Sequence, residues 1–77
     1  MACYTTIEQM KREAEQSDDG VCRVWLRDEE CWLRAQHYID GTLSWYGAGF
    51  VIGEDEATKF FDSEVKTYGW VSGERRP

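Results

Sequence analysis

The chain lacks any long hydrophobic run. Its longest apolar stretch lies around Ala48 to Ile52 and is interrupted by Gly49. A membrane-spanning helix needs about 20 apolar residues, and the core of a signal peptide needs about 7–15. Neither is present in this sequence, so we predict an unprocessed protein that works in the cytoplasm and does not contact a membrane.

Positive charge is also scarce. The 77 residues include 9 Lys and Arg against 15 Asp and Glu, which gives a formal net charge of -6. Arg23, Arg27 and Arg34 alternate with tryptophan and acidic residues and do not form the basic patch that attracts a phosphate backbone. We therefore expect no direct binding to nucleic acid. An acidic surface instead attracts proteins whose own grooves bind nucleic acid.

Cysteine and histidine are too few, and too irregularly spaced, for a metal site. The three cysteines, Cys3, Cys22 and Cys31, form no Cys-x-x-Cys motif, and His37 is the only histidine. A site built from Cys22, Cys31 and His37 matches none of the usual zinc spacings. We expect reduced thiols that pack as small hydrophobic groups, with no metal and no cofactor.

Aromatic and hydrophobic residues, by contrast, are plentiful, at 14% and 42% of the chain. This content is too high for a disordered acidic chain, and a chain of this length forms one domain at most. We predict a single domain over residues 1–73 and a flexible tail over residues 74–77.

A helix signature opens the chain. The segment Thr5-Thr6-Ile7-Glu8 fits a capping box, in which Thr5 is the N-cap and Glu8 reaches back to its amide. Ile7, Met10 and Ala14 follow at spacings of three and four residues and form an apolar stripe. Turn-forming residues at positions 17–20 then end the helix.

From Val21 the apolar period changes to two, which indicates strands. The predicted strands are Val21–Arg27, Cys31–Ile39 and Thr42–Ile52. An acidic turn at residues 28–30 joins the first two, and it places Cys22 opposite Ala35 and Cys31 opposite Leu26. The two cysteines are then too far apart to form a disulfide.

A tight turn at Asp40-Gly41 joins the second and third strands. Asp-Gly between two alternating runs favours a two-residue type I′ turn. In that register Ile39 pairs with Thr42, Gln36 with Trp45 and Ala35 with Tyr46. The turn therefore decides which face of the sheet each aromatic side chain occupies.

The last third of the chain carries a second helix signal. Glu54-Asp55-Glu56 supplies negative charge where a helix N-terminus favours it. We predict a short helix with Ala57, Phe60 and Phe61 turned inward, ending at Asp62-Ser63, and a fourth strand over Val65–Val71. The fold class is then α+β: an antiparallel β-meander of three to four strands, with the N-terminal helix and the short second helix packed on one face.

The two faces of this meander differ in chemistry. One is apolar and forms the core beneath the helices. The other face, which no helix obviously covers, mixes arginines with large aromatic residues: Arg23, Arg27, Arg34, Trp25, Trp32, Trp45 and Tyr38. Because Trp, Tyr and Arg are enriched in binding hot spots, this face is either a partner surface, including a homodimer interface, or a solvent face on which arginines stack on tryptophans.

Carboxylates gather in turns and at helix ends. The clusters are Asp18-Asp19, Asp28-Glu29-Glu30, Glu54-Asp55-Glu56 and Asp62 with Glu64. In the predicted meander, the second and third clusters fall at the same edge of the sheet. The predicted partner-binding residues are therefore these six acids and the three face tryptophans: Asp28, Glu29, Glu30, Glu54, Asp55, Glu56, Trp25, Trp32 and Trp45.

No arrangement of residues indicates catalysis, because the carboxylates sit in solvated turns and so short a chain leaves little volume for a pocket. We predict that the protein is not an enzyme. The leading interpretation is a protein-binding inhibitor, a DNA mimic whose carboxylates replace phosphates in a basic groove of its target. The alternative is a cytosolic homodimeric accessory domain that uses its Trp-rich sheet face.

In its size, acidity, aromatic content and lack of an enzyme motif, the whole chain resembles the small phage-encoded anti-CRISPR and anti-restriction proteins. The resemblance is carried by these overall properties and by no motif matched residue by residue. It implies a target in a CRISPR–Cas complex or another nucleic-acid-handling defence enzyme, met in the cytoplasm of the host cell.

Overall fold

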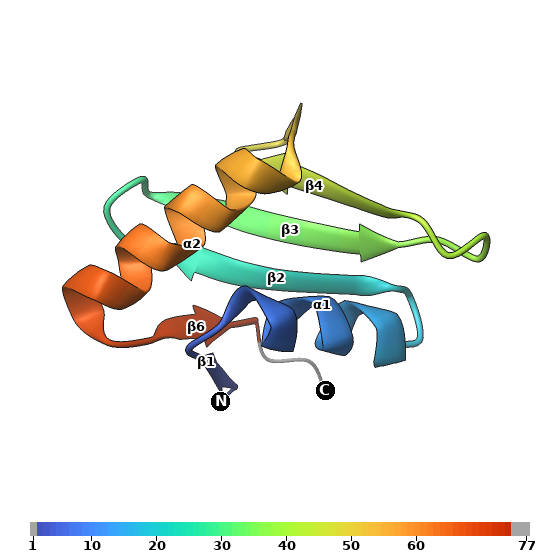
Figure 1. The fold of residues 1–77 in the computed structure, drawn as a ribbon, viewed down its shortest axis with the longest axis horizontal. Coiled ribbons are helices and arrows are strands. Elements are labelled where there is room, and N and C mark those ends of the chain that lie inside the picture. Colours follow the sequence, from blue (N-terminus) through green and yellow to red (C-terminus); the bar gives the residue numbers. More distant parts are fainter. Residues whose placement is uncertain (1, 75–77) are drawn as a thin grey trace.

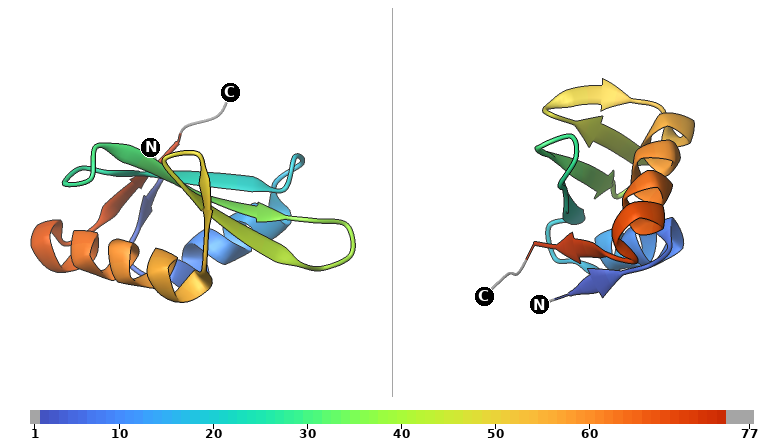
Figure 2. Two further views of the ribbon diagram at one scale, coloured as in Figure 1. Left: turned by 90° about the horizontal axis from the view of Figure 1, so that it is seen from above. Right: turned by 90° about the vertical axis from the view of Figure 1, so that its left-hand side faces the viewer.

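The computed structural model, which describes residues 2–74, has one antiparallel sheet and two helices, and it confirms the predicted α+β class (Figure 1). The elements in chain order are β1 (Cys3–Tyr4), α1 (Ile7–Gln16), β2 (Val21–Leu26), β3 (Cys31–His37), β4 (Leu43–Gly47), β5 (Phe50–Ile52), α2 (Glu54–Tyr68) and β6 (Val71–Gly73). The sheet order is β1-β6-β2-β3-β4-β5. Both helices lie on the same side of the sheet, which leaves its other face open (Figure 2).

Helix α1 begins one residue later than predicted. Its N-cap is Thr6, and the side chain that reaches back belongs to Gln9, not to Glu8. The Gln9 Oε1 atom accepts hydrogen bonds from the backbone N–H of Thr5 (2.7 Å) and of Thr6 (3.1 Å). The predicted apolar stripe is confirmed, because Ile7, Met10 and Ala14 are all buried against the sheet.

Strands β2 and β3 pair in the predicted register. Cys22 lies opposite Ala35, and Leu26 lies opposite Cys31. No disulfide forms among the described residues, and this register keeps Cys22 and Cys31 apart. The same pairing sets Val24 against Leu33, and both are fully buried beneath the helices. The centre of the core therefore follows from strand alternation alone.

The predicted pairing of β3 with β4 is wrong by one residue. The loop between them has three residues, because the Tyr38 N–H donates to the Thr42 carbonyl and the Gly41 N–H donates to the Tyr38 carbonyl, both at 2.9 Å. Gly41 has a φ of 90°, which fits the bulge residue of a three-residue hairpin loop and not a two-residue type I′ turn. Ala35 consequently pairs with Trp45 and not with Tyr46.

This one-residue shift exchanges the faces of two aromatic side chains. Trp45, predicted on the open face, is buried in the core at 3% exposure. Tyr46, which the predicted register paired with Ala35 on the core face, lies on the open face opposite Arg34. The Asp40 carboxylate caps the loop by accepting from the backbone N–H of Thr42 (2.9 Å) and from its hydroxyl (2.7 Å), and these bonds lower the pKa of Asp40.

The predicted third strand is in fact two strands. Ala48 and Gly49, with φ of 52° and 85°, form a tight turn that pairs Gly47 with Phe50. Two successive positive φ values are typical of the type I′ hairpin turn. Strand β5 therefore folds back beside β4 and becomes an edge of the sheet, where Phe50 and Val51 are each 75% exposed.

The second helix is longer than predicted. Helix α2 continues through Asp62-Ser63 to Tyr68 and ends at Gly69, whose φ of 88° is left-handed and whose N–H donates to the Val65 carbonyl (2.7 Å). The predicted strand Val65–Val71 is therefore wrong except at its last residue. The β-propensity of Thr67 and Tyr68 is overridden because the segment continues the amphipathic pattern of the helix.

The first and last strands of the described residues, β1 and β6, pair with each other in the sheet. Strand β6 lies between β2 and the two-residue strand β1, which has no sequence signal of its own. Glu74, predicted at the start of a flexible tail, donates its N–H to the Arg23 carbonyl (2.8 Å). The rest of that predicted tail, residues 75–77, lies outside the described residues.

Candidate functional site

The acidic clusters divide into carboxylates with structural partners and carboxylates that face solvent. Asp28 accepts a hydrogen bond from the Tyr68 hydroxyl (2.6 Å), and this bond raises the pKa of Tyr68. Glu54 accepts from Lys11 Nζ (3.0 Å) and from the indole N–H of Trp45 (3.2 Å), and the bond from Lys11 is the main cause of its lowered pKa. Asp19 accepts from the Ser17 hydroxyl (2.7 Å) and from the Val21 backbone N–H (3.1 Å). Apart from Asp19, Asp28 and Glu54, the exposed members of the clusters are Asp18, Glu29, Glu30, Asp55, Glu56 and Asp62.

Two of the exposed acids share one hollow. A concavity of about 310 Å³ between the β4–β5 hairpin and α2 has Glu29 from the β2–β3 turn and Glu56 from the start of α2 in its lining. The other lining residues are mainly apolar: Leu26, Cys31, Gly47, Ala48, Phe50, Ile52 and Phe60. The structure thus brings together one member of each predicted acidic triplet, whereas Glu54 is tied to α1 and to the core.

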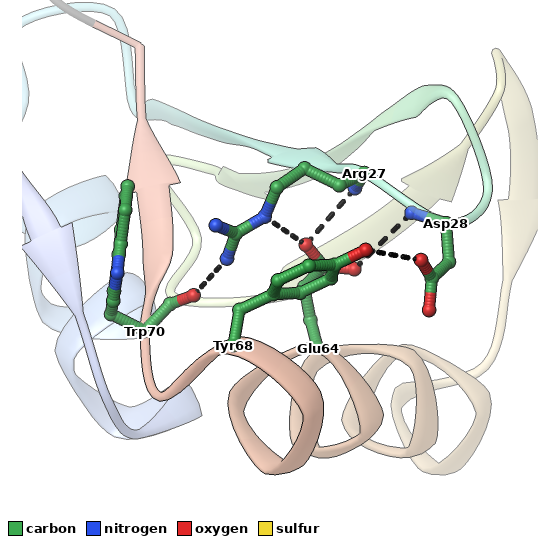
Figure 3. Close-up of polar contacts among 5 residues, drawn as sticks. All are labelled: Arg27, Asp28, Glu64, Tyr68 and Trp70. Atoms are coloured by element: carbon green, nitrogen blue, oxygen red, sulfur yellow. Dashed lines mark hydrogen bonds and ion pairs between the residues drawn. The ribbon is translucent and has the colours of Figure 1, made fainter.

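Glu64 is the only buried charged or polar side chain among residues 2–74, at 3% exposure. Its Oε2 atom accepts from Arg27 Nε (2.6 Å) and from the Arg27 backbone N–H (3.0 Å), and its Oε1 faces the Asp28 backbone N–H at 3.5 Å (Figure 3). This carboxylate therefore holds the β2–β3 turn onto α2. The sequence does carry a signal for it, because Ala57, Phe61 and Glu64 are spaced on one helical stripe.

Arg27 fills the space between α2 and β6. Its guanidinium carbon lies 3.9 Å from the centre of the Tyr68 ring and 4.5 Å from the centre of the Trp70 ring, and Nη2 donates to the Trp70 carbonyl (Figure 3). The prediction that Arg27 belongs to the open face is wrong. Strand β2 ends at Leu26, so the strand's alternation of side chains between the two faces does not extend to Arg27.

The open face keeps two of the three predicted tryptophans. Trp25 and Trp32 are cross-strand partners that meet edge to face, with ring centres 5.1 Å apart. Beside them, the Arg34 guanidinium stacks 4.1 Å from the centre of the Tyr46 ring, and the hydroxyls of Tyr46 and Tyr38 are 2.9 Å apart. That hydrogen bond is the main cause of the raised pKa of Tyr38.

Two general features of the described part of the chain bear on function. Within residues 2–74, no three His, Cys, Asp or Glu side chains gather closely enough to hold a metal ion, so Cys22, Cys31 and His37 do not form a site. No helix in the same range is long and apolar enough to cross a membrane. The candidate binding groups on the described surface are the exposed acids, the aromatic rings and the arginines.

No family model, curated protein or solved structure matches this chain.

Proposed function

We propose that this protein is a small acidic inhibitor that binds a protein target through the hollow between the β4–β5 hairpin and α2. The observation that supports the proposal is the meeting of Glu29 and Glu56 in a mainly apolar concavity. Its target is a CRISPR–Cas or other host-defence complex with a basic nucleic-acid-binding groove, met in the cytoplasm. This target class rests on the resemblance in size and composition.

The chemistry of the hollow suits a basic side chain. Lysine and arginine carry a charged head on an apolar stem, so the head can pair with Glu29 or Glu56 while the stem packs against Phe50 and Phe60. The nearby exposed acids Glu30 and Asp55 extend the negative charge. In a groove that normally holds phosphates, such carboxylates act as a nucleic-acid mimic, and the negative field accelerates association.

A DNA-binding assay with matched variants tests the proposal. Purified CRISPR–Cas complexes and restriction enzymes are mixed with labelled target DNA and the full chain, and we expect one of them to lose DNA binding. The double variant Glu29→Lys/Glu56→Lys should slow association with that target by about tenfold or more at low salt and should flatten its salt dependence.

The control is Glu8→Lys/Glu15→Lys, which makes the same change in net charge at two exposed positions on α1. Neither position lines the hollow, so this variant should retain most of the inhibition although its net charge equals that of the test variant. Equal losses in the two double variants would reject the hollow as the contact. Undisturbed DNA binding by every complex in the panel would reject the inhibitor proposal for those targets.

A second candidate is a homodimeric accessory domain, and the uncovered Trp25–Trp32 pair favours it. Aromatic residues left accessible on an open sheet face are typical of an interface. Trp32 is 43% exposed and Trp25 is half-buried. Sedimentation equilibrium over a range of concentrations tests this candidate. A dimer that dissociates in Trp32→Ala but persists in Glu29→Lys/Glu56→Lys would favour the accessory domain.

A further inference from the structure

A second hollow, of about 140 Å³, lies on the open face of the sheet. It is lined by Arg23, Trp32, Arg34, Tyr46 and Gly49. Two cationic side chains thus share a small concavity with two aromatic rings, on a protein whose net charge is -6. This combination is opposite in charge to the hollow that contains Glu29 and Glu56.

Arg34 differs from the other half-buried cations of residues 2–74 in having no carboxylate partner. Lys11 pairs with Glu54, Arg23 with Glu74 and Arg27 with Glu64, at 3.0, 2.7 and 2.6 Å respectively. Among these described residues no carboxylate forms an ion pair with Arg34, whose guanidinium stacks on the Tyr46 ring. Its Nε is also the one buried side-chain nitrogen or oxygen of the described residues without a hydrogen-bond partner. A buried donor without an acceptor is unfavourable, and such exceptions call for an explanation.

We propose that this hollow binds a side-chain carboxylate from an acidic segment of a protein partner, with the Arg34 guanidinium as its principal donor. A planar guanidinium matches a carboxylate through two parallel hydrogen bonds, and stacking on Tyr46 holds its plane in place. The charge of Arg23 is already balanced by Glu74, so Arg34 supplies the unmatched positive charge.

The size and walls of the hollow favour an acidic side chain of a polypeptide. Its volume of about 140 Å³ is small, which suits a single carboxylate and its adjoining methylene groups. Trp32, which lines the hollow and is 43% exposed, offers an apolar surface to the chain on either side of that carboxylate. The occupant we assign is therefore a glutamate- or aspartate-containing peptide segment.

A titration followed by NMR tests the proposal on the full, ¹⁵N-labelled chain at physiological salt. The probes are a capped tetraglutamate peptide, the matching tetraglutamine peptide and inorganic phosphate. We expect tetraglutamate to shift the Arg34 Nε–H and Trp32 indole N–H signals and to bind about tenfold or more tightly than tetraglutamine, because only the former presents a carboxylate.

Two substitutions assign the effect to Arg34. Arg34→Gln should weaken tetraglutamate binding by about tenfold, whereas Arg12→Gln, the same charge change at an exposed position of α1, should not. Arg34→Lys keeps the charge without the planar donor pair and should fall between these two. The NMR spectrum shows whether Arg34→Gln is folded. If it is not, the peptide affinity of Arg34→Lys is measured in its place.

Several results would overturn the proposal. Equal binding of the two peptides would make the contact apolar, and equal losses in Arg34→Gln and Arg12→Gln would make it a general charge effect. Phosphate binding that exceeds tetraglutamate binding would define a small-anion site. A dimer lost in Arg34→Gln, with no peptide binding, would assign the hollow to a second copy of the chain. None of these readouts depends on Glu29 or Glu56, so they are independent of the inhibitor assay.

Discussion

Arg27 and Arg34 stack on aromatic rings at similar distances, yet their surroundings differ. The guanidinium of Arg27 is 3.9 Å from the centre of the Tyr68 ring, and that of Arg34 is 4.1 Å from the centre of the Tyr46 ring. Arg27 also pairs with the buried Glu64, and its side chain lies between α2 and β6. Arg34 belongs to β3 and lines the hollow on the open face, and within residues 2–74 no carboxylate forms an ion pair with it.

A helix that covers part of the sheet requires the charged groups beneath it to be paired. Burying a carboxylate beneath a helix is costly unless a cation and hydrogen-bond donors compensate for its lost hydration, so Glu64 and Arg27 require each other. On the open face no helix covers the sheet (Figure 2), so a half-buried arginine there is not required to compensate for a buried carboxylate. The covered region therefore contributes stability, and the open region keeps groups that are available for contact.

The largest expected effect is the loss of the Arg27–Glu64 pair. Glu64→Ala leaves a partly buried guanidinium without its carboxylate and should lower the free energy of unfolding by about 3–5 kcal/mol, a large share of the total for a domain of this size. Urea denaturation followed by circular dichroism measures it. Asp62→Ala, an exposed position on the same helix, should cost little. A loss below about 1 kcal/mol for Glu64→Ala would show that the pair does not stabilise the covered region.

The second largest expected effect concerns the β3–β4 loop, because its length decides which face of the sheet Trp45 and Tyr46 occupy. Gly41→Val forces a β-branched residue to a φ of 90° and should cost about 1–3 kcal/mol. Gly53→Val is the matched control: a Cβ at either glycine meets no atom within 4 Å, but the φ of Gly53 is -78°. Thermal denaturation compares the stability of the two variants. If both lose the same stability, the positive φ of Gly41 is not the cause of the loss.

A smaller effect should appear at alkaline pH. Burial is the main cause of the raised pKa of Tyr4, whose hydroxyl accepts from the Cys22 thiol (3.8 Å). A raised folded-state pKa contributes stability that is complete below the unfolded value of about 10 and is lost as the pH rises above it. Tyr4→Phe should therefore reduce the decline in unfolding free energy between about pH 9 and 11.

Tyr38 on the open face provides the comparison for that measurement. Its pKa is also raised, but mainly through the hydrogen bond with Tyr46 and not through burial. Tyr38→Phe should keep most of the alkaline decline seen in the natural chain. If urea denaturation shows the opposite order for the two variants, the open face carries the pH dependence.

The smallest expected effect is that of Arg34→Gln on stability. A cation–π contact that is not fully desolvated contributes about 0.5–1 kcal/mol, and the substitution breaks no ion pair within residues 2–74. The unfolding free energy measured in urea should therefore change by less than about 1 kcal/mol, while acidic-peptide binding is lost. A loss as large as that of Glu64→Ala would erase the proposed difference between the two regions.

Local pattern was sufficient for part of the fold. The stripe of Ile7, Met10 and Ala14 on α1 and the register of β2 with β3 follow from the spacing of apolar residues, because a helix and a two-strand pair have fixed periods. The same alternation predicts Trp25 and Trp32 on the open face, where the structure places them. The meeting of Glu29 with Glu56 also agrees with the predicted approach of the two acidic triplets.

Tertiary structure decided the rest, for two physical reasons. Asp40-Gly41 suits both a two-residue and a three-residue loop, and only the packing of Trp45 in the core distinguishes registers that differ by one residue. Residues Val65–Tyr68 have strand propensity, but they extend α2, and α2 can bury the Glu64 carboxylate because Arg27, 37 positions earlier, supplies the compensating charge. A sequence displays periods and propensities directly, whereas pairings between distant residues exist only once the chain has folded.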